Sequence, residues 1–311
     1  MKIQVPLDGY QGSSVIVMPS PGLYRREADQ PGSHCPRCNP ESVNDTEQPQ
    51  RAVPLVSVFT LGRFSLLLKG VPAEYGRKAP KRPLELLKAI IALGGRDIST
   101  VTLMSALWPD ADGDSAQRSF DTTLHRLRKV LGDDRVLALN DGKLTLDGRY
   151  CWVDVWQFER LLGQVSRLLA LDIRGERATE LENLSERLLS LYQNHFLSVE
   201  DATSWSVSMQ ERLRSKFIFH LLEVGRYMEK NGNQDLAMRY YRKGSDTDDL
   251  VEVFYQRMMQ CCIETGRYSE GMSVYRRCRQ VLSVVLGLHP EPLTESLYRA
   301  LNNSRSKQQT A

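Results

Sequence analysis

"SFDTTLHRLRKVLG", residues 119–132, places four basic side chains among leucines at helical spacing. On a wheel of 100° per residue, Phe120, Leu124, Leu127 and Leu131 form one apolar stripe. The opposite face carries no acidic residue and consists of Arg118, Thr122, His125, Arg126 and Lys129. Thr123 and Arg128 lie to the sides of this face. Such a helix either has a solvated basic face or binds nucleic acid. The flanking sequence has to discriminate between these two interpretations.

The segments around this helix predict a small domain with sheet and helix. From Val56, "VSVFTLGRFSLLLKGVPAEYG" is typical of a short antiparallel meander. One helix is expected from Pro83, and a second is capped by Ser99 or Thr100 and ends at Pro109. After the basic helix, "VLALNDGKLTLDGRY" predicts a hairpin about an Asn-Asp-Gly turn. The order sheet, helix, helix, helix, hairpin is that of a winged helix-turn-helix, whose last helix enters the major groove.

Beyond about residue 154 the pattern is helical throughout. Helices are predicted over 155–172, 176–193, 203–230, 233–245, 248–265, 267–286 and 291–304. Within this part, "GNQDLAMRYYR" from Gly232 and "GRYSEGMSVYR" from Gly266 repeat at an offset of 34 residues. That period indicates tetratricopeptide-like (TPR-like) helix pairs, which stack into interaction surfaces. No third clear copy is visible.

Residues 55 to 304 resemble a family of bacterial regulators. "RSFDTTLHRLRKVLG" and "LNDGKLTL" are similar to the recognition helix and the wing of OmpR-type winged-helix domains. Together with "WVDVWQFERLL", they resemble the bacterial transcriptional activator domain (BTAD) architecture of SARP-type regulators, and most closely the C-terminal portion of MalT-like regulators. "LYQNHFL", "MQERLRSKF" and "VYRRCRQVLSVVLGLHPEPLTESLYRAL" are similar to the helical domain of that family.

The resemblance implies DNA binding by the winged helix and contacts with an effector, another copy or RNA polymerase by the helical domain. The family's recognition positions fall on Arg118, Thr122, Thr123, Arg126 and Arg128, with Lys143 at the wing tip. The wheel adds His125 and Lys129 to this set, and it places Thr123 and Arg128 to the sides. No G-x-x-x-x-G-K-[ST] phosphate loop and no phospho-receiver domain accompany these motifs, so the input signal stays unassigned.

A second basic cluster precedes the first predicted helix. "GRKAPKRP", residues 76–83, contains Arg77, Lys78, Lys81 and Arg82. These side chains either keep a loop soluble or hold phosphates next to a helix N-terminus, and their place in the basic part of the chain favours phosphate contact.

Other candidate chemistry is weak. "SHCPRC" supplies His34, Cys35 and Cys38, half of a zinc-knuckle spacing, but a structural zinc needs four ligands and no second close pair follows. We therefore expect no metal site, and no motif for a cofactor or a catalytic triad is present. The sequence predicts a protein that is not an enzyme.

Composition and charge fit this interpretation. The net charge is only +3, but residues 51–150 hold 16 Lys and Arg against 11 Asp and Glu, a net of +5, so the basic part is the winged-helix region. The six cysteines are too sparse for a disulfide framework, and no signal peptide or apolar run of membrane-spanning length occurs. A cytoplasmic protein without membrane contact is expected.

We therefore expect a mainly α protein with a small β part. The predicted organisation is a flexible Pro-rich tail (1–54), an OmpR-type winged helix (55–151), a TPR-like BTAD helical domain (152–304) and a flexible C-terminus (305–311). The predicted function is DNA-binding transcription regulation, as an activator, with helix 118–131 in the major groove of double-stranded DNA. RNA polymerase or another regulatory protein is a further expected partner, and a homodimer is compatible with this kind of domain. The alternative is an interaction scaffold whose winged helix mediates assembly without specific DNA binding.

Overall fold

A computed structural model describes residues 54–75, 79–171, 173–200 and 202–309, without the side chains of 305–309. Residues 1–53 of the predicted tail, which include Cys35 and Cys38, lie outside these residues, as do Arg77 and Lys78. The described part of the chain belongs to one compact unit.

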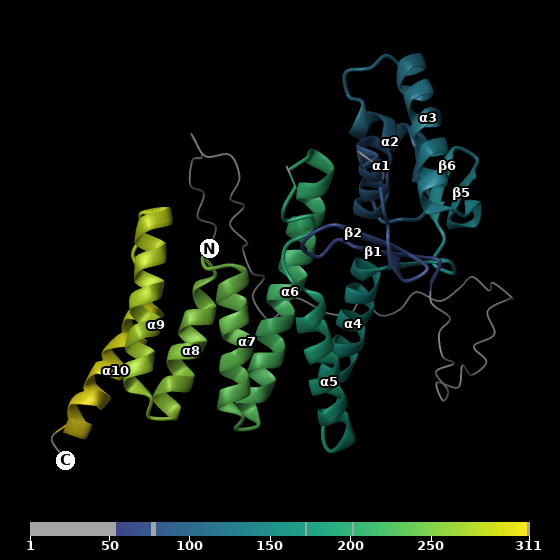
Figure 1. Ribbon diagram of the computed structural model, residues 1–311. Helices are drawn as coiled ribbons and strands as arrows, with labels where there is room; N and C mark the ends of the chain where they lie inside the picture. The colour runs from purple at the N-terminus through teal and green to yellow at the C-terminus, as the bar shows by residue number, and fades with distance from the viewer. Residues whose placement is uncertain (1–53, 76–78, 172, 201, 310–311) are drawn as a thin grey trace, which may run out of the picture. The chain divides into compact units, whose positions relative to one another are not determined.

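The N-terminal part is a winged helix with two small sheets (Figure 1). One sheet has the order β3-β2-β1-β7 and the other β4-β6-β5. The strands are β1 (Val56–Phe59), β2 (Ser65–Leu68), β3 (Val71–Pro72), β4 (Ile98–Ser99), β5 (Leu137–Asn140), β6 (Lys143–Leu146) and β7 (Cys151–Val153). The helices are α1 (Lys81–Ala92), α2 (Thr100–Leu107) and α3 (Gly113–Leu131). The predicted hairpin is present, since β5 and β6 pair antiparallel around Asp141 and Gly142.

The apolar stripe of α3 packs into the core of this domain, as its spacing predicts. Phe120, Leu124 and Leu127 are at most 4% exposed, and α1 packs against α3. Burying each such side chain contributes about 1.5–3 kcal/mol, so this stripe fixes which face of α3 remains outside. The basic face is exposed as a consequence of packing.

Strand β7 is a part of the domain that the sequence did not predict. It pairs in parallel with β1, with Val56 opposite Cys151 and Val58 opposite Val153. A three-residue strand has no periodicity of its own, and its partner lies some ninety residues earlier in the chain. The predicted boundary at residue 151 therefore falls inside a strand that joins the two parts of the protein.

The rest of the described chain is an all-α repeat domain (Figure 1). Its helices are α4 (Asp154–Leu169), α5 (Glu176–Leu191), α6 (Ser204–Lys230), α7 (Gln234–Thr247), α8 (Glu252–Glu264), α9 (Tyr268–Val281), a π-helical turn (Leu282–Leu286) and α10 (Pro292–Gln309). From α6 to α10 each helix packs against the next along the chain. The predicted helices are all present, and their ends shift by up to five residues.

The 34-residue repeat corresponds to the pairs α6/α7 and α8/α9. Gly232 and Gly266 have φ of 77° and 71° in the turn of each pair, a left-handed conformation that suits glycine. At the C-terminus, α10 continues to Gln309, five residues past the predicted helix end at residue 304. Ser304 to Gln309 carry no apolar periodicity, which is why the sequence did not predict this last part of the helix.

Candidate nucleic-acid interface

Helix α3 begins and ends with specific caps. The Asp112 carboxylate accepts a hydrogen bond from the Ser115 backbone N–H at 2.7 Å, which satisfies one of the free donors of the first turn. Gly132 ends the helix at φ 73°, and its N–H donates to the Arg128 carbonyl. These caps fix where the helix that carries the basic face begins and ends.

The structure exposes the face that the wheel predicted. The residues on it are all exposed side by side along α3: Arg118, Thr122, His125, Arg126 and Lys129. The described part of the chain shows neither a hydrogen bond nor an ion pair for the side chains of Arg118 and Arg126. This differs from other arginines of the domain, because Arg135 pairs with Asp133 at 2.7 Å and Arg149 with Asp147 at 2.6 Å.

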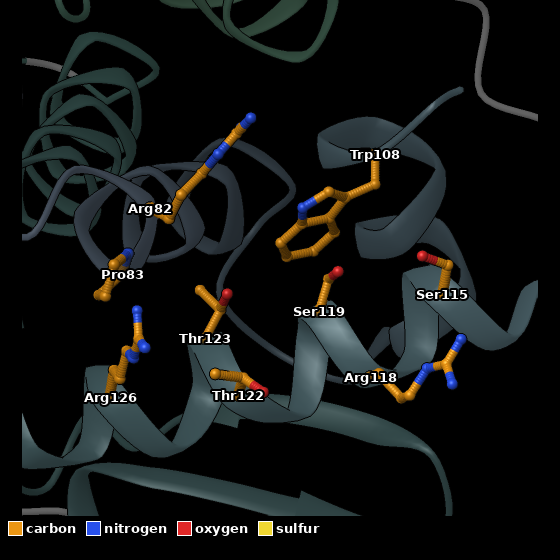
Figure 2. A pocket seen from close by; sticks show the side chains of 9 residues that line it. All are labelled: Arg82, Pro83, Trp108, Ser115, Arg118, Ser119, Thr122, Thr123 and Arg126. Atoms are coloured by element: carbon orange, nitrogen blue, oxygen red, sulfur yellow. The ribbon is translucent and has the colours of Figure 1, made fainter. Parts of the chain in front are cut away.

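Arg118, Thr122 and Arg126 of this face form part of one wall of a concave surface of about 530 Å³. Its other wall comes from the start of α1 and the residue after α2 (Figure 2). The lining residues are Arg82, Pro83, Trp108, Ser115, Arg118, Ser119, Thr122, Thr123 and Arg126. Three arginines therefore line one hollow together with residues that bear hydroxyls and an indole, and such groups suit contacts with phosphates and base edges.

Thr123 and Arg128 have positions different from the rest of the predicted set. Thr123 is only 7% exposed, and in Figure 2 it lies between Arg126 and Ser119. Arg128 is half-buried, and its Nη2 lies 3.5 Å from the Leu137 carbonyl oxygen at the start of β5. Both side chains therefore contact the protein itself, which makes them the weakest members of the predicted DNA-binding set.

The remaining predicted cations border α3 or the wing. Lys143 is exposed at the tip of the β5–β6 hairpin, where the resemblance placed it. Lys81 and Arg82 are exposed in the first turn of α1, and Arg82 also pairs with Glu85 at 2.9 Å. That pair is exposed, so it contributes at most about 1 kcal/mol and leaves Arg82 available.

Acids flank the basic face without neutralising it. Asp121 is exposed on α3, but its carboxylate accepts hydrogen bonds from Gln117 at 3.0 and 3.1 Å. Asp114 lies in the first turn of α3, where a carboxylate complements the positive end of the helix dipole. The centre of the face thus stays positive.

Sequence reasoning missed part of this surface. Trp108, Ser115 and Ser119 line the hollow although the wheel did not select them, because a single-helix wheel cannot show how α2 meets α3. Trp108 is half-buried against the core and also lines the hollow.

Comparison with known families bears on the helical domain. Residues 153–302 match the family described as the bacterial transcriptional activator domain. Residues 153–302 thus carry a bacterial transcriptional activator domain. The expected resemblance to BTAD-containing regulators of the SARP type is confirmed.

Two further proteins are similar to this BTAD protein. One is the regulatory protein AfsR of Streptomyces griseus, 24% identical over 213 residues, which are 67% of this chain and 21% of AfsR. The chain thus spans about a fifth of the length of that relative. The other is the solved structure of Mycobacterium tuberculosis EmbR in complex with a low affinity phosphopeptide, with a TM-score of 0.61, 18% identity, and coverage of 83% of this chain and 69% of EmbR.

The EmbR likeness supports the predicted fold class, a winged helix followed by an α-helical repeat domain. At 18% identity it shows the fold and no more. Among the described residues, no helix is long and apolar enough to cross a membrane, and no three potential metal ligands lie together.

Proposed function

We propose that this BTAD protein is a transcriptional regulator that binds double-stranded DNA through the exposed face of α3. The observation that carries the proposal is the group of unpaired cations on that face, Arg118 and Arg126 above all. An exposed guanidinium without an acidic partner is free to form bidentate contacts with guanine or phosphate. The helix has a buried apolar stripe on its other side, so its orientation toward DNA is preset.

The proposal divides the contacts by type. Base readout is assigned to Arg118, Thr122, His125 and Arg126 in the major groove. Phosphate contact is assigned to Lys129, to Lys143 on the wing and to Lys81 and Arg82 at the start of α1. Arg77 and Lys78 belong to the same set of predicted phosphate-contacting residues, on the basis of the sequence alone.

The helical domain is proposed to contact other proteins. Stacked helix pairs present extended surfaces for partners, and AfsR, to which the chain is similar, is named a regulatory protein. Activation of transcription through contact with RNA polymerase, with no enzymatic activity, is the form of regulation we infer.

The test is capture of genomic DNA fragments by the purified protein at near-physiological salt. Wild type is compared with Arg118→Ala/Arg126→Ala and with Arg187→Ala, which removes an exposed arginine from α5. We expect wild type and Arg187→Ala to enrich one shared sequence motif, and the double variant to lose it. Failure of wild type to enrich any motif would refute the proposal and favour the scaffold alternative.

A further inference from the structure

A groove of about 470 Å³ lies between α9 and α10, the two helices that pack together at the C-terminal end of the helical domain (Figure 1). We call it the α9 groove, because one face of α9 and of the π-helical turn after it supplies most of its lining. These residues are Met272, Tyr275, Arg276, Arg279, Gln280 and Ser283. Tyr298 of α10 completes the lining and stacks on Tyr275 with the ring centroids 4.1 Å apart.

The two arginines of the α9 groove are exposed, and neither forms a hydrogen bond or an ion pair with a described residue. Arg277, between them in the sequence, differs because it pairs with Asp246 of α7 at 3.1 Å. The Tyr275 hydroxyl is also engaged, since it donates to a Glu295 carboxylate oxygen at 2.7 Å. The groove therefore presents two free guanidinium groups, and a carboxylate is the group that a guanidinium binds most specifically in proteins.

The internal repeat indicates what kind of element meets an arginine at this position. Arg276 lies 34 residues after Arg242, at the same place in its repeat. Arg242 of α7 pairs with Glu270 of α9, the corresponding helix of the next repeat. A helix that carries a carboxylate is thus the neighbour that this position has one repeat earlier.

No described helix takes that place beside Arg276. The turn at Gly266 would recur 34 residues later, at Ala300, but α10 (Pro292–Gln309) continues through Ala300 without a break. The described chain therefore does not return along α9, and the face that bears Arg276 and Arg279 stays open.

Exposed apolar side chains follow the α9 groove directly in the chain. The described residues include thirteen large apolar side chains that are exposed, and five of them lie within ten residues: Val284, Val285, Leu286, Leu288 and Leu293. Single exposed apolar residues are ordinary, whereas a cluster of them marks an interaction site. Because Ser283 lines the groove and Val284 is the next residue, the free cations and the apolar cluster belong to one end of the domain.

We propose that this end of the helical domain binds an amphipathic helix of another protein. Carboxylates of that helix pair with Arg276 and Arg279, and its apolar side chains cover Val285 and Leu288, as in other complexes in which a helix lies in a groove. The proposal rests on the protein-contact role proposed above for the helical domain, and it gives that contact a place and a chemistry.

The test measures binding of a defined probe to the full chain without DNA, by fluorescence anisotropy. The probe is a labelled, stapled helical peptide with one row of leucines and, beside it, one row of glutamates. A second peptide carries glutamine in place of every glutamate. We expect saturable binding of the glutamate peptide and about 3- to 10-fold weaker binding of the glutamine peptide, because exposed ion pairs each contribute modestly.

Two matched double variants locate the site. Arg276→Gln/Arg279→Gln should bind both peptides alike, whereas Arg118→Gln/Arg126→Gln, which removes two unpaired arginines from α3, should keep the preference for glutamate. Val285→Ser/Leu288→Ser should weaken both peptides by a similar factor. All six positions are exposed, so the variants should melt close to the wild-type temperature.

The proposal is overturned if the glutamate peptide does not bind saturably, if the two peptides bind wild type equally, or if Arg276→Gln/Arg279→Gln keeps the preference. It is also overturned if the α3 variant loses that preference. Since no DNA is present, these outcomes are separate from the capture experiment, and either result can fail while the other stands.

Discussion

At the residue scale, two kinds of polar side chain distinguish this protein. Among the described residues, Arg118 and Arg126 of the α3 face are exposed without side-chain partners, while the Nε2 atom of His220 is buried without one. An exposed cation keeps its hydration in the folded protein and remains accessible to a ligand. A buried imidazole instead makes stability depend on pH.

His220 gives the first prediction. Its pKa is about 4 in the folded protein because of burial, against about 6.5 in the unfolded chain. Between these values the unfolded chain binds more protons, so the contribution of His220 to the free energy of unfolding is complete above pH 6.5 and is lost as pH falls toward 4. A difference of this size corresponds to on the order of 3 kcal/mol.

Urea unfolding of wild type and His220→Phe at pH 7 and pH 4.5 measures this effect. The variant should lose less stability than wild type between the two pH values, because phenylalanine does not titrate and can still stack on Phe217. An equal loss in the two proteins would show that His220 does not titrate with a lowered pKa.

At the element scale, close helix packing is built on small residues. A Cβ at Gly225 of α6 would collide with the Tyr241 ring of α7, and one at Gly271 of α9 would come within 2.6 Å of Leu301 of α10. The approach of successive helices in the repeat therefore depends on particular glycines.

Gly225→Ala and Gly163→Ala form a matched pair for the second prediction. The first should destabilise the protein by about 1–3 kcal/mol through overpacking. The second should stabilise it by about 0.5–1 kcal/mol, since alanine is the better helix former and meets no neighbour. Chemical denaturation measures both changes in the free energy of unfolding. If both variants were stabilised or both destabilised, this account of packing would be contradicted.

Much of the fold was visible in the sequence at this scale. The α3 stripe, the hairpin and the helices beyond residue 154 follow from local periodicity and turn residues, which can be read from the sequence. Strand β7 and the wall of the hollow formed by Trp108 depend on contacts between segments far apart in the chain, so no local sequence pattern predicts them. The exposed face of α3 was predictable because burial of Leu124 and Leu127 leaves only one orientation for Arg126.

At the scale of the whole molecule, one buried carboxylate joins the winged helix to the helical domain. Asp154, at the start of α4, accepts from the Thr60 N–H at 2.5 Å, the Thr60 hydroxyl at 2.7 Å and the Leu61 N–H at 2.7 Å. Lys88 of α1 also pairs with Glu200 at 2.5 Å, and the Gly62 N–H donates to the His195 carbonyl. These contacts connect the winged helix directly with the helical domain.

Asp154→Ala is the third prediction. It leaves the Thr60 and Leu61 donors buried without an acceptor, so the free energy of unfolding should fall by about 3–5 kcal/mol. In calorimetry we expect wild type to unfold in one thermal transition and Asp154→Ala to unfold in two. Asp121→Ala, which removes an exposed carboxylate, is the control and should change stability by no more than about 0.5 kcal/mol. If Asp154→Ala unfolds as wild type does, the carboxylate does not join the domains.

The central claim is that α3 reads bases while the wing holds phosphate. The most direct measurement is equilibrium binding to the selected DNA motif and to its single base-pair variants, at several salt concentrations, for wild type, Arg126→Ala and Lys143→Ala. We predict that Arg126→Ala loses about 1–3 kcal/mol on the motif together with discrimination at one base pair. Lys143→Ala should weaken all sequences alike and reduce the salt slope by about 1. If Arg126→Ala instead weakens every sequence equally and keeps full discrimination, the exposed face of α3 does not read the DNA sequence through Arg126.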